Sequence, residues 1–401
     1  MSFLPRTLAG FTLSCLFLFT VGCGGGGMSS VSNPTPSPTT PTPSPNPSTG
    51  TQTGVQHIVV LVMQNASFDH LFGTYPESNG NTVERFHPGV PGYTQTDAAG
   101  NSVSPFLMKA LAPDPLPEGP KAYEAVINGG LMDKFAFNNG DESMGYYDNT
   151  TDGISTLWAY AQQYALADHY FGSVIGEAPS NQLYLVAAND NDFPFSWQPS
   201  YGPCNLADPV SIPLTFPNIG DQLSEKGISW SAYQEDLGNC SAYKATHDPF
   251  QYFTSTKGTT RDYAQFSSDL SSGKLPAVSF IFPNNRDDMH PGFGPITNGI
   301  SFIDTLVKQV QSSSAWNSTA IVVVWDAGGG WYDHVPPPTM DSQGLNVRVP
   351  MLVISPLAKA NYVSHVQMDH VSILRFIQNN WGLQPLNSRN SQSTDISDMF
   401  K

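Results

Sequence analysis

Four clusters of polar residues carry the side chains of this sequence that could do chemistry. Each cluster contains Asp, Asn or His and follows an uninterrupted apolar run. Carboxylates and amides bind hard cations through oxygen, and imidazoles transfer protons near neutral pH. Because the same arrangement recurs, we expect the clusters to form one site from separate loops. They occupy residues 64–70, 283–290, 326–334 and 355–370.

The third cluster allows two interpretations. Asp326 is followed by Ala327 and then by three glycines, which let a backbone approach a ligand or another loop closely. The same residues are also typical of a tight turn capped by an aspartate. Farther along, His334 is either an imidazole held by Asp333 for catalysis or a structural histidine in the proline-rich loop that follows.

Two further positions are ambiguous when they are taken alone. Ser180 lies just before an apolar segment with a helical pattern, so it is a helix N-cap or a reactive hydroxyl. These interpretations are compatible, because a helix N-terminus also stabilises a phosphate. His247 stands before an Asp-Pro-Phe sequence and carries little information by itself.

The apolar runs predict the elements that position these side chains. They cover residues 57–63, 277–282, 320–325 and 349–355, and they do not alternate with polar residues. Such runs are typical of strands buried on both faces of a parallel sheet. Helical patterns cover 299–310 and 370–378. We therefore expect an α/β fold with one mostly parallel sheet, whose ligands bind beyond the carboxyl ends of the strands.

The charge balance limits the possible partners. The 401 residues include 17 Lys and Arg against 33 Asp and Glu, which gives a formal net charge of −16. Nucleic acid is excluded as the main partner, because phosphate backbones are bound by basic surfaces. An anionic substrate would need a local device such as a metal ion, a helix N-terminus or a histidine cluster.

The first part of the chain predicts export. Residues 1–22 hold one charge and then an apolar run too short to span a membrane, which is typical of a secretory signal. The run ends at Cys23 in a sequence like a bacterial lipobox, so we expect lipidation of Cys23, with an ordinary signal peptide as the alternative. Residues 23–54 are rich in Gly, Pro, Ser and Thr and predict a tether. We expect a folded domain over 55–401, held by its lipid anchor to a membrane of the cell envelope.

Two cysteines remain in the predicted domain. Cys204 and Cys240 have no Cys or His at the spacing of a zinc site. In an exported chain, such a pair is most simply a disulfide, which would stabilise the fold by about 3–4 kcal/mol. We expect this pair to be structural.

The motifs in their order along the chain resemble the bacterial phosphoesterase family of phospholipases C and acid phosphatases. The resemblance covers nearly all of residues 55–401 and is carried by long, collinear segments. It implies an alkaline phosphatase-like three-layer α/β sandwich. The segments are Gln64-Asn-Ala-Ser-Phe-Asp-His70, Asn128-Gly-Gly with Met132-Asp133, Ser143-Met-Gly-Tyr-Tyr147, Tyr233-Gln-Glu-Asp236, His247-Asp-Pro-Phe250, 326–338, 349–356, Tyr362-Val-Ser-His365, 369–374, 380–383 and Asp398-Met-Phe400.

The resemblance also implies a reaction and its residues. Such enzymes cleave phosphate esters, either phospholipids or small phosphoesters, with a Ser or Thr nucleophile and a metal ion between the nucleophile and the phosphate. By this resemblance the nucleophile is Ser180. The divalent metal would lie between the pairs 64–65 and 326–327, with Gln64, Asn65 and Asp326 as ligands. The supporting imidazoles would be His247, His290 and His334.

Several positions depart from the family pattern. Gln64 stands where the family has a Glu, and Ala327 replaces an acid, so a divalent cation would be held less tightly. The family carries a His shortly before the segment 128–130, and this chain has none there. The segment after Ser180 is about two residues shorter than usual. Two hypotheses follow, an exported phosphoesterase with a retuned site or a catalytically impaired, surface-tethered binding protein.

Overall fold

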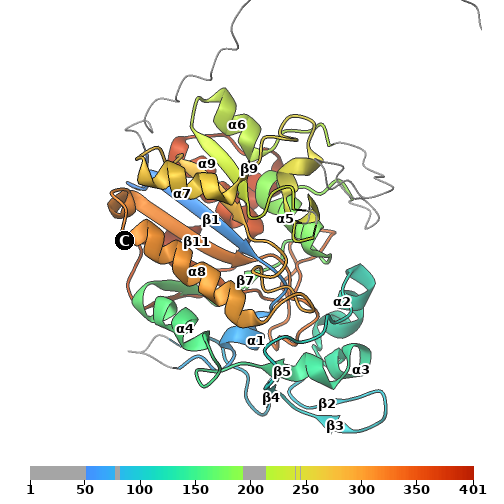
Figure 1. Ribbon diagram of the computed structural model, residues 1–401. Coiled ribbons are helices and arrows are strands. Elements are labelled where there is room, and N and C mark those ends of the chain that lie inside the picture. The colour runs from blue at the N-terminus through green and yellow to red at the C-terminus, as the bar shows by residue number, and fades with distance from the viewer. Residues whose placement is uncertain (1–50, 77–81, 193–213, 240, 244) are drawn as a thin grey trace, which may run out of the picture. The chain divides into compact units, whose positions relative to one another are not determined.

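The computed structural model describes residues 51–76, 82–192, 214–239, 241–243 and 245–401. The expected signal segment, Cys23, most of the tether and the Cys204–Cys240 pair lie outside these residues. An eight-stranded sheet forms the centre of the described part, in the order β13-β6-β12-β11-β1-β10-β8-β9 (Figure 1). No helix within these ranges combines the length and the apolar character that a membrane span requires.

One half of the sheet is parallel, as the apolar runs predict. Its strands are β1 (His57–Met63), β10 (Val278–Phe282), β11 (Thr319–Trp325), β8 (Trp230–Gln234) and β9 (Arg261–Asp262). β1 lies between β10 and β11 and is parallel to both. Their carboxyl ends, and therefore the loops that follow them, lie at one edge of the sheet.

The other half of the sheet corrects one expectation. β12 (Met351–Ile354) is antiparallel both to β11 and to β6 (Ala165–Ala167). The end of β12 thus lies beside the start of β11, where the Ser355 hydroxyl donates to the Thr319 carbonyl at 2.8 Å. The prediction that the polar residues directly after this strand join the others at one edge is wrong, because an apolar run does not reveal the direction of its strand.

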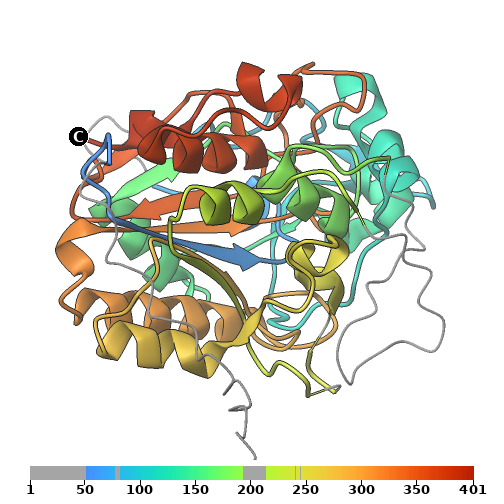
Figure 2. The same ribbon diagram turned by 90° about the horizontal axis from the view of Figure 1, so that it is seen from above.

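Helices cover both faces of the sheet and make three layers. Figure 2 shows α9 (His370–Trp381), α5 (Ala178–Ala187) and α6 (Ile219–Glu225) on one face. On the other face lie α4 (Ile154–Gln163), α7 (Tyr263–Ser271) and α8 (Ile296–Gln311). The predicted α/β class with a mostly parallel sheet between helical layers is confirmed.

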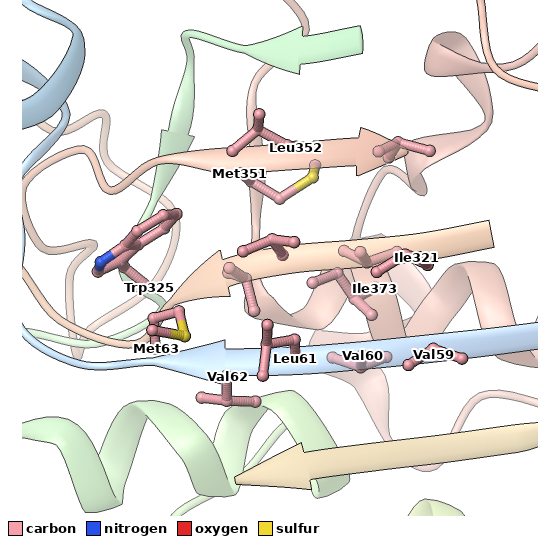
Figure 3. Close-up of a cluster of buried hydrophobic side chains, with 14 of the residues drawn as sticks. Val59, Val60, Leu61, Val62, Met63, Ile321, Trp325, Met351, Leu352 and Ile373 are labelled. Carbon is pink, nitrogen blue, oxygen red and sulfur yellow. The ribbon is translucent and has the colours of Figure 1, made fainter. Parts of the chain in front are cut away.

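The core lies between these layers. Side chains from three neighbouring strands and from α9 pack together in Figure 3, including Leu61, Trp325, Leu352 and Ile373, and each is at most 1% exposed (Figure 3). Burying one such side chain stabilises a fold by about 1.5–3 kcal/mol. The strands are therefore a rigid support for the loops at their ends.

A smaller group of elements lies beyond the carboxyl end of β1, where both views place α2 (Pro120–Ile127) and α3 (Phe135–Asn139) (Figures 1 and 2). Within the described ranges, the remaining helices are α1 (Phe68–Phe72) and α10 (Ser388–Gln392), with 3-10 turns at Asn128–Gly130, Asp141–Met144, Ala245–His247, Pro249–Tyr252, Trp316–Ser318 and Ile396–Met399. The remaining strands are β2 (Gln95–Thr96), β3 (Ser102–Val103), β4 (Phe106–Leu107), β5 (Gly145–Tyr146), β7 (Tyr170–Phe171), β13 (Tyr362–Ser364) and β14 (Met368–Asp369).

Candidate active site

The register of β1 and β11 brings two predicted site residues together. Met63 pairs with Trp325, so Gln64 and Asp326 leave the sheet side by side. The Asp326 amide donates to the Met63 carbonyl at 3.0 Å, and the Asn65 amide donates to Oδ1 of Asp326 at 3.3 Å. Asn65 has a left-handed backbone with φ of 56°, a conformation that asparagine tolerates better than most residues.

The glycines after Asp326 allow two loops to approach closely. A Cβ atom on Gly329 would lie 2.5 Å from the Asn65 carbonyl oxygen, and one on Gly330 would lie 2.8 Å from the carbonyl oxygen of Pro117. Both glycines also have positive φ. The glycine run therefore serves close backbone approach, which is one of the two interpretations that the sequence leaves open.

Asp326 is a buried carboxylate with an amide partner. Its side chain is 1% exposed, and Nε2 of Gln182 donates to Oδ2 at 2.7 Å. Burial raises the pKa of Asp326 to about 6, although the hydrogen bond from Gln182 and the charge of His247 act in the opposite direction. Gln182, which the sequence did not single out, belongs to α5 and connects that helix to the site.

His370 contacts the backbone of Asp326. Its Nε2 lies 2.8 Å from the Asp326 carbonyl oxygen, and its Nδ1 lies 2.9 Å from the Tyr170 hydroxyl. Burial lowers the pKa of His370 to about 4, so the ring is neutral at pH 7. A neutral ring that donates from Nε2 must accept at Nδ1. The Tyr170 hydroxyl therefore donates the hydrogen bond to Nδ1 of His370.

The loop after β10 and a 3-10 turn bring two predicted imidazoles together. Nδ1 of His247 lies 3.2 Å from Oδ2 of Asp288, and Oδ1 of Asp288 accepts from the His290 amide at 2.7 Å. The two rings are nearly parallel, with centroids 6.1 Å apart. The Asp288 carbonyl accepts from the Gln64 amide at 2.8 Å, so this pair lies next to the end of β1.

Glu118 is a site residue that sequence reasoning missed. Its Oε1 accepts from Nδ2 of Asn65 at 2.9 Å. Burial, together with the nearby charges of Asp326 and Glu177, raises the pKa of Glu118 to about 8. No local pattern in the sequence points to Glu118, which lies in a proline-rich loop.

The structure turns Ser180 away from Asp326. Residues four apart on a helix share a face, so Gln182 shares its face with Ala178, while Ser180 is about 200° around the axis from Gln182. Ser180 instead makes a side-chain hydrogen bond with Asp190. Both line an open cavity of about 250 Å³. Ser180 is also not the N-cap that the sequence allowed, because the N-cap of α5 is Glu177.

His334 belongs to a separate buried cluster. Its Nδ1 contacts Oδ2 of Asp69 at 2.6 Å, and Arg348 donates to Asp69 at 2.9 Å and to Asp333 at 2.8 Å. Burial lowers the pKa of His334, but the charge and hydrogen bond of Asp69 outweigh burial and raise it overall. None of these contacts involves Asp326, so the structure does not bring His334 to the other predicted residues.

Two groups of side chains have donor atoms that suit a metal ion. Within the described ranges, one group of three suitable residues has ligand atoms all within 4.8 Å, namely Asp69, Asp333 and His334. Arg348 already forms ion pairs with both carboxylates and cancels one of their two charges, which weakens their attraction for a cation. The second group lies at the end of β1 and β11, where Gln64, Asn65 and Gln182 each keep a buried amide oxygen without a hydrogen-bond partner. Such oxygens fit a hard cation.

The comparisons with known proteins agree with the resemblance of the motifs. A model of the Phosphoesterase family matches residues 55–384, so the chain belongs to this family. It is 26% identical to Phospholipase C A of Mycobacterium tuberculosis, over 86% of this chain and 76% of the relative. It is also 26% identical to the non-hemolytic phospholipase C of Pseudomonas aeruginosa, over 83% of this chain and 55% of the relative.

Solved structures resemble the chain more distantly. A protein of the alkaline phosphatase superfamily from Vibrio parahaemolyticus matches with a TM-score of 0.39 and 12% identity, over 82% of this chain and 80% of the other. Murine ectonucleotide pyrophosphatase / phosphodiesterase 5 matches with a TM-score of 0.41 and 9% identity, over 86% of this chain and 100% of the other.

Proposed function

We propose that this protein hydrolyses phosphate esters at the carboxyl edge of its parallel strands. The observation that carries the proposal is the convergence of Asn65, Asp326, His247 and His290 from separate loops onto this edge. Membership of the Phosphoesterase family supports it, because the relatives named above are phospholipases C. The substrate class is a phospholipid or a small phosphoester.

Each side chain has a role in this proposal. His247, beside the Asp288 carboxylate, is placed to give a proton to the leaving group. Asn65 and the amino end of α5 supply N–H groups for phosphate oxygens. A hard cation held by Asn65 and Asp326 would supply positive charge for the phosphate. Ser180, which the resemblance implies as the nucleophile, lies on the other face of α5 from Asp326. In this role its proton would pass to Asp190, to which it is hydrogen-bonded, and the phosphate would have to reach the cavity that these two residues line.

Phosphatase assays test this proposal. The purified protein is incubated with p-nitrophenyl phosphate and with bis-p-nitrophenyl phosphate, with and without Mn²⁺. We expect slow release of nitrophenol that Ser180→Ala reduces by at least about 10³-fold, because a covalent nucleophile has no substitute. Turnover equal to that of Ser180→Ala would contradict the role of Ser180, and no turnover in either protein would contradict hydrolysis.

A second candidate function rests on one observation. Ser180 lies on the face of α5 that points away from Asp326. On the face that contacts Asp326 through Gln182, the residue at the amino end of the helix is Ala178, which has no hydroxyl. On that geometry the protein binds phosphate esters without cleaving them. Calorimetric titration with phosphocholine separates the two functions, since binding without turnover supports the second and binding with turnover supports the first.

We also propose that the protein is exported and anchored to a membrane through lipid on Cys23. The signal-like segment and the neutral tether before the folded domain support this. Cell fractionation tests it, because the wild-type protein should be found with membranes and Cys23→Ala should not. Recovery of both proteins in the same soluble fraction would rule the anchor out.

A further inference from the structure

We infer that Glu118 is a cation ligand, which acts together with Asp326 and Asn65 and supplies a carboxylate in place of those missing at Gln64 and Ala327. The inference deepens the proposed function, because it concerns the same site. It differs from the ligand set that the motifs imply, in which all the acids come from the ends of β1 and β11. Glu118 comes instead from the loop before α2.

The position of Glu118 is the first argument. Oε1 of Glu118 contacts Nδ2 of Asn65 at 2.9 Å, and the backbone amide of the same Asn65 contacts Oδ1 of Asp326 at 3.3 Å. One asparagine thus connects two carboxylates that come from different loops. Within the described residues neither carboxylate forms an ion pair with a Lys or Arg.

The second argument is a set of buried oxygens without partners. Gln64, Asn65 and Gln182 are at most 2% exposed, and each keeps an amide oxygen that accepts no hydrogen bond. In Asn65 and Gln182 that oxygen is bonded to the same carbon as the nitrogen that contacts Glu118 or Asp326. A buried oxygen without a partner costs about 1–3 kcal/mol. A cation between the carboxylates would give these oxygens a partner.

The third argument is that the loop of Glu118 is held in place. Nδ2 of Asn139 donates to the carbonyl oxygens of both Pro117 and Gly330, at 3.3 and 3.0 Å. This contact fixes the residue next to Glu118 against the glycine run that follows Asp326. Because Asn139 holds these two loops together, the loops that carry Glu118 and Asp326 are positioned before any ligand binds, which lowers the entropy cost of binding.

The donor set defines the class of ligand. Two carboxylates with amide oxygens suit Mg²⁺, Mn²⁺ or Ca²⁺, and no sulfur donor is involved. The chain therefore keeps an all-oxygen site although two acids of the family pattern are absent. Glu118 binds the cation in this site. The site has two full negative charges, and Glu118 contributes one of them.

Calorimetric titration of the metal-free protein with Mn²⁺ tests the inference without substrate. We expect one site per chain in the wild-type protein and at least about tenfold weaker binding in Glu118→Gln, which removes the charge and keeps the shape. Glu118→Asp keeps the charge and should bind with intermediate affinity. Glu225→Gln, the same change at an exposed position on α6, is the matched control and should bind as the wild type does.

Each outcome decides the question. Wild-type affinity in Glu118→Gln, or no Mn²⁺ binding in the wild-type protein, would overturn the inference. Circular dichroism of each metal-free variant separates loss of the ligand from loss of the fold. Binding is measured without turnover, so a protein that binds Mn²⁺ through Glu118 but cleaves no ester would contradict hydrolysis and leave this inference standing.

Discussion

The cluster around Arg348 shows that residues typical of catalysis can serve the fold. Asp69, Asp333 and His334 have the types expected of an active site, yet the fully buried guanidinium of Arg348 contacts both carboxylates. It also donates to the Asp168 carbonyl at 3.1 Å. Arg348 thus connects α1, the loop after β11 and the end of β6, three segments far apart in the sequence.

Replacing Arg348 should destabilise the protein strongly. Arg348→Met keeps most of the side-chain volume but leaves the buried carboxylate of Asp333 without its cation and leaves Asp69 with His334 alone. Removing one partner of a buried ion pair costs about 3–5 kcal/mol, so we expect a loss of that size in the free energy of unfolding. Urea denaturation measures it.

An exposed arginine gives the matched control. Arg286 pairs with Asp236 at 3.4 Å, and its side chain is 60% exposed. Arg286→Met should change stability by less than about 1 kcal/mol, because exposed ion pairs contribute little. If both variants lost a similar amount of free energy of unfolding, the buried cluster would contribute no more to stability than an exposed ion pair.

At the scale of elements, the four strands with uninterrupted apolar runs were predictable, because burial on both faces leaves a clear pattern. The run at 57–63 is β1, and the runs at 277–282 and 320–325 match β10 and β11 to within one residue at either end. The helical patterns at 299–310 and 370–378 lie within α8 and α9. The direction of β12 was not predictable, since it depends on the path of the connection and not on local residues.

The site residues that lie directly after neighbouring parallel strands were predictable from the sequence, and the other site residues were not. Asn65 and Asp326 meet because their strands are parallel neighbours. Glu118 lies in a proline-rich loop without periodicity, so nothing local placed it beside Asn65. The direction of Ser180 depends on how α5 is rotated against the sheet, which the contact of Gln182 with Asp326 determines.

The rotation of α5 leads to a prediction for Ala178. Ala178 begins the helix and shares a face with Gln182, which contacts Asp326. A hydroxyl there would lie at the helix N-terminus on the side of Asp326. If phosphate esters bind on the side of Asp326, as in the second candidate function, Ala178→Ser should raise the turnover of bis-p-nitrophenyl phosphate by at least about tenfold, which corresponds to about 1.4 kcal/mol in the barrier.

The double variant Ala178→Ser with Ser180→Ala is the control for this gain. It should keep the increase if the new hydroxyl is the one that reacts. Turnover in Ala178→Ser that is no higher than in the wild-type protein would mean that this face of α5 does not carry the reaction, and the role proposed for Ser180 would gain support.

At the scale of the whole molecule, few charges and a net charge of −16 coexist with several buried or half-buried carboxyl groups whose pKa is raised. Burial raises the pKa of Glu118 to about 8 and that of Glu235 to about 7. Burial also lowers the pKa of His70 and of His370 to about 4. The acids and the histidines affect stability in opposite directions, over ranges of pH that overlap below pH 6.5.

Below pH 6.5 the two groups oppose each other. A raised carboxyl pKa means that the folded state holds more protons than the unfolded state, so stability falls as pH rises from the unfolded value toward the folded one. A lowered histidine pKa has the opposite effect between about pH 4 and 6.5, where the unfolded state holds more protons. Above pH 6.5 the contribution of His70 and His370 is complete, and the raised acids dominate.

We therefore predict that the metal-free protein loses stability as pH rises from 6.5 to 8. Each additional proton held by the folded state gives a slope of about 1.4 kcal/mol per pH unit. Urea denaturation with EDTA at several pH values measures the slope. Glu118→Gln should flatten it, because the group whose raised pKa extends to about 8 is removed. A slope that is unchanged in Glu118→Gln, or stability that rises over this range, would contradict the prediction.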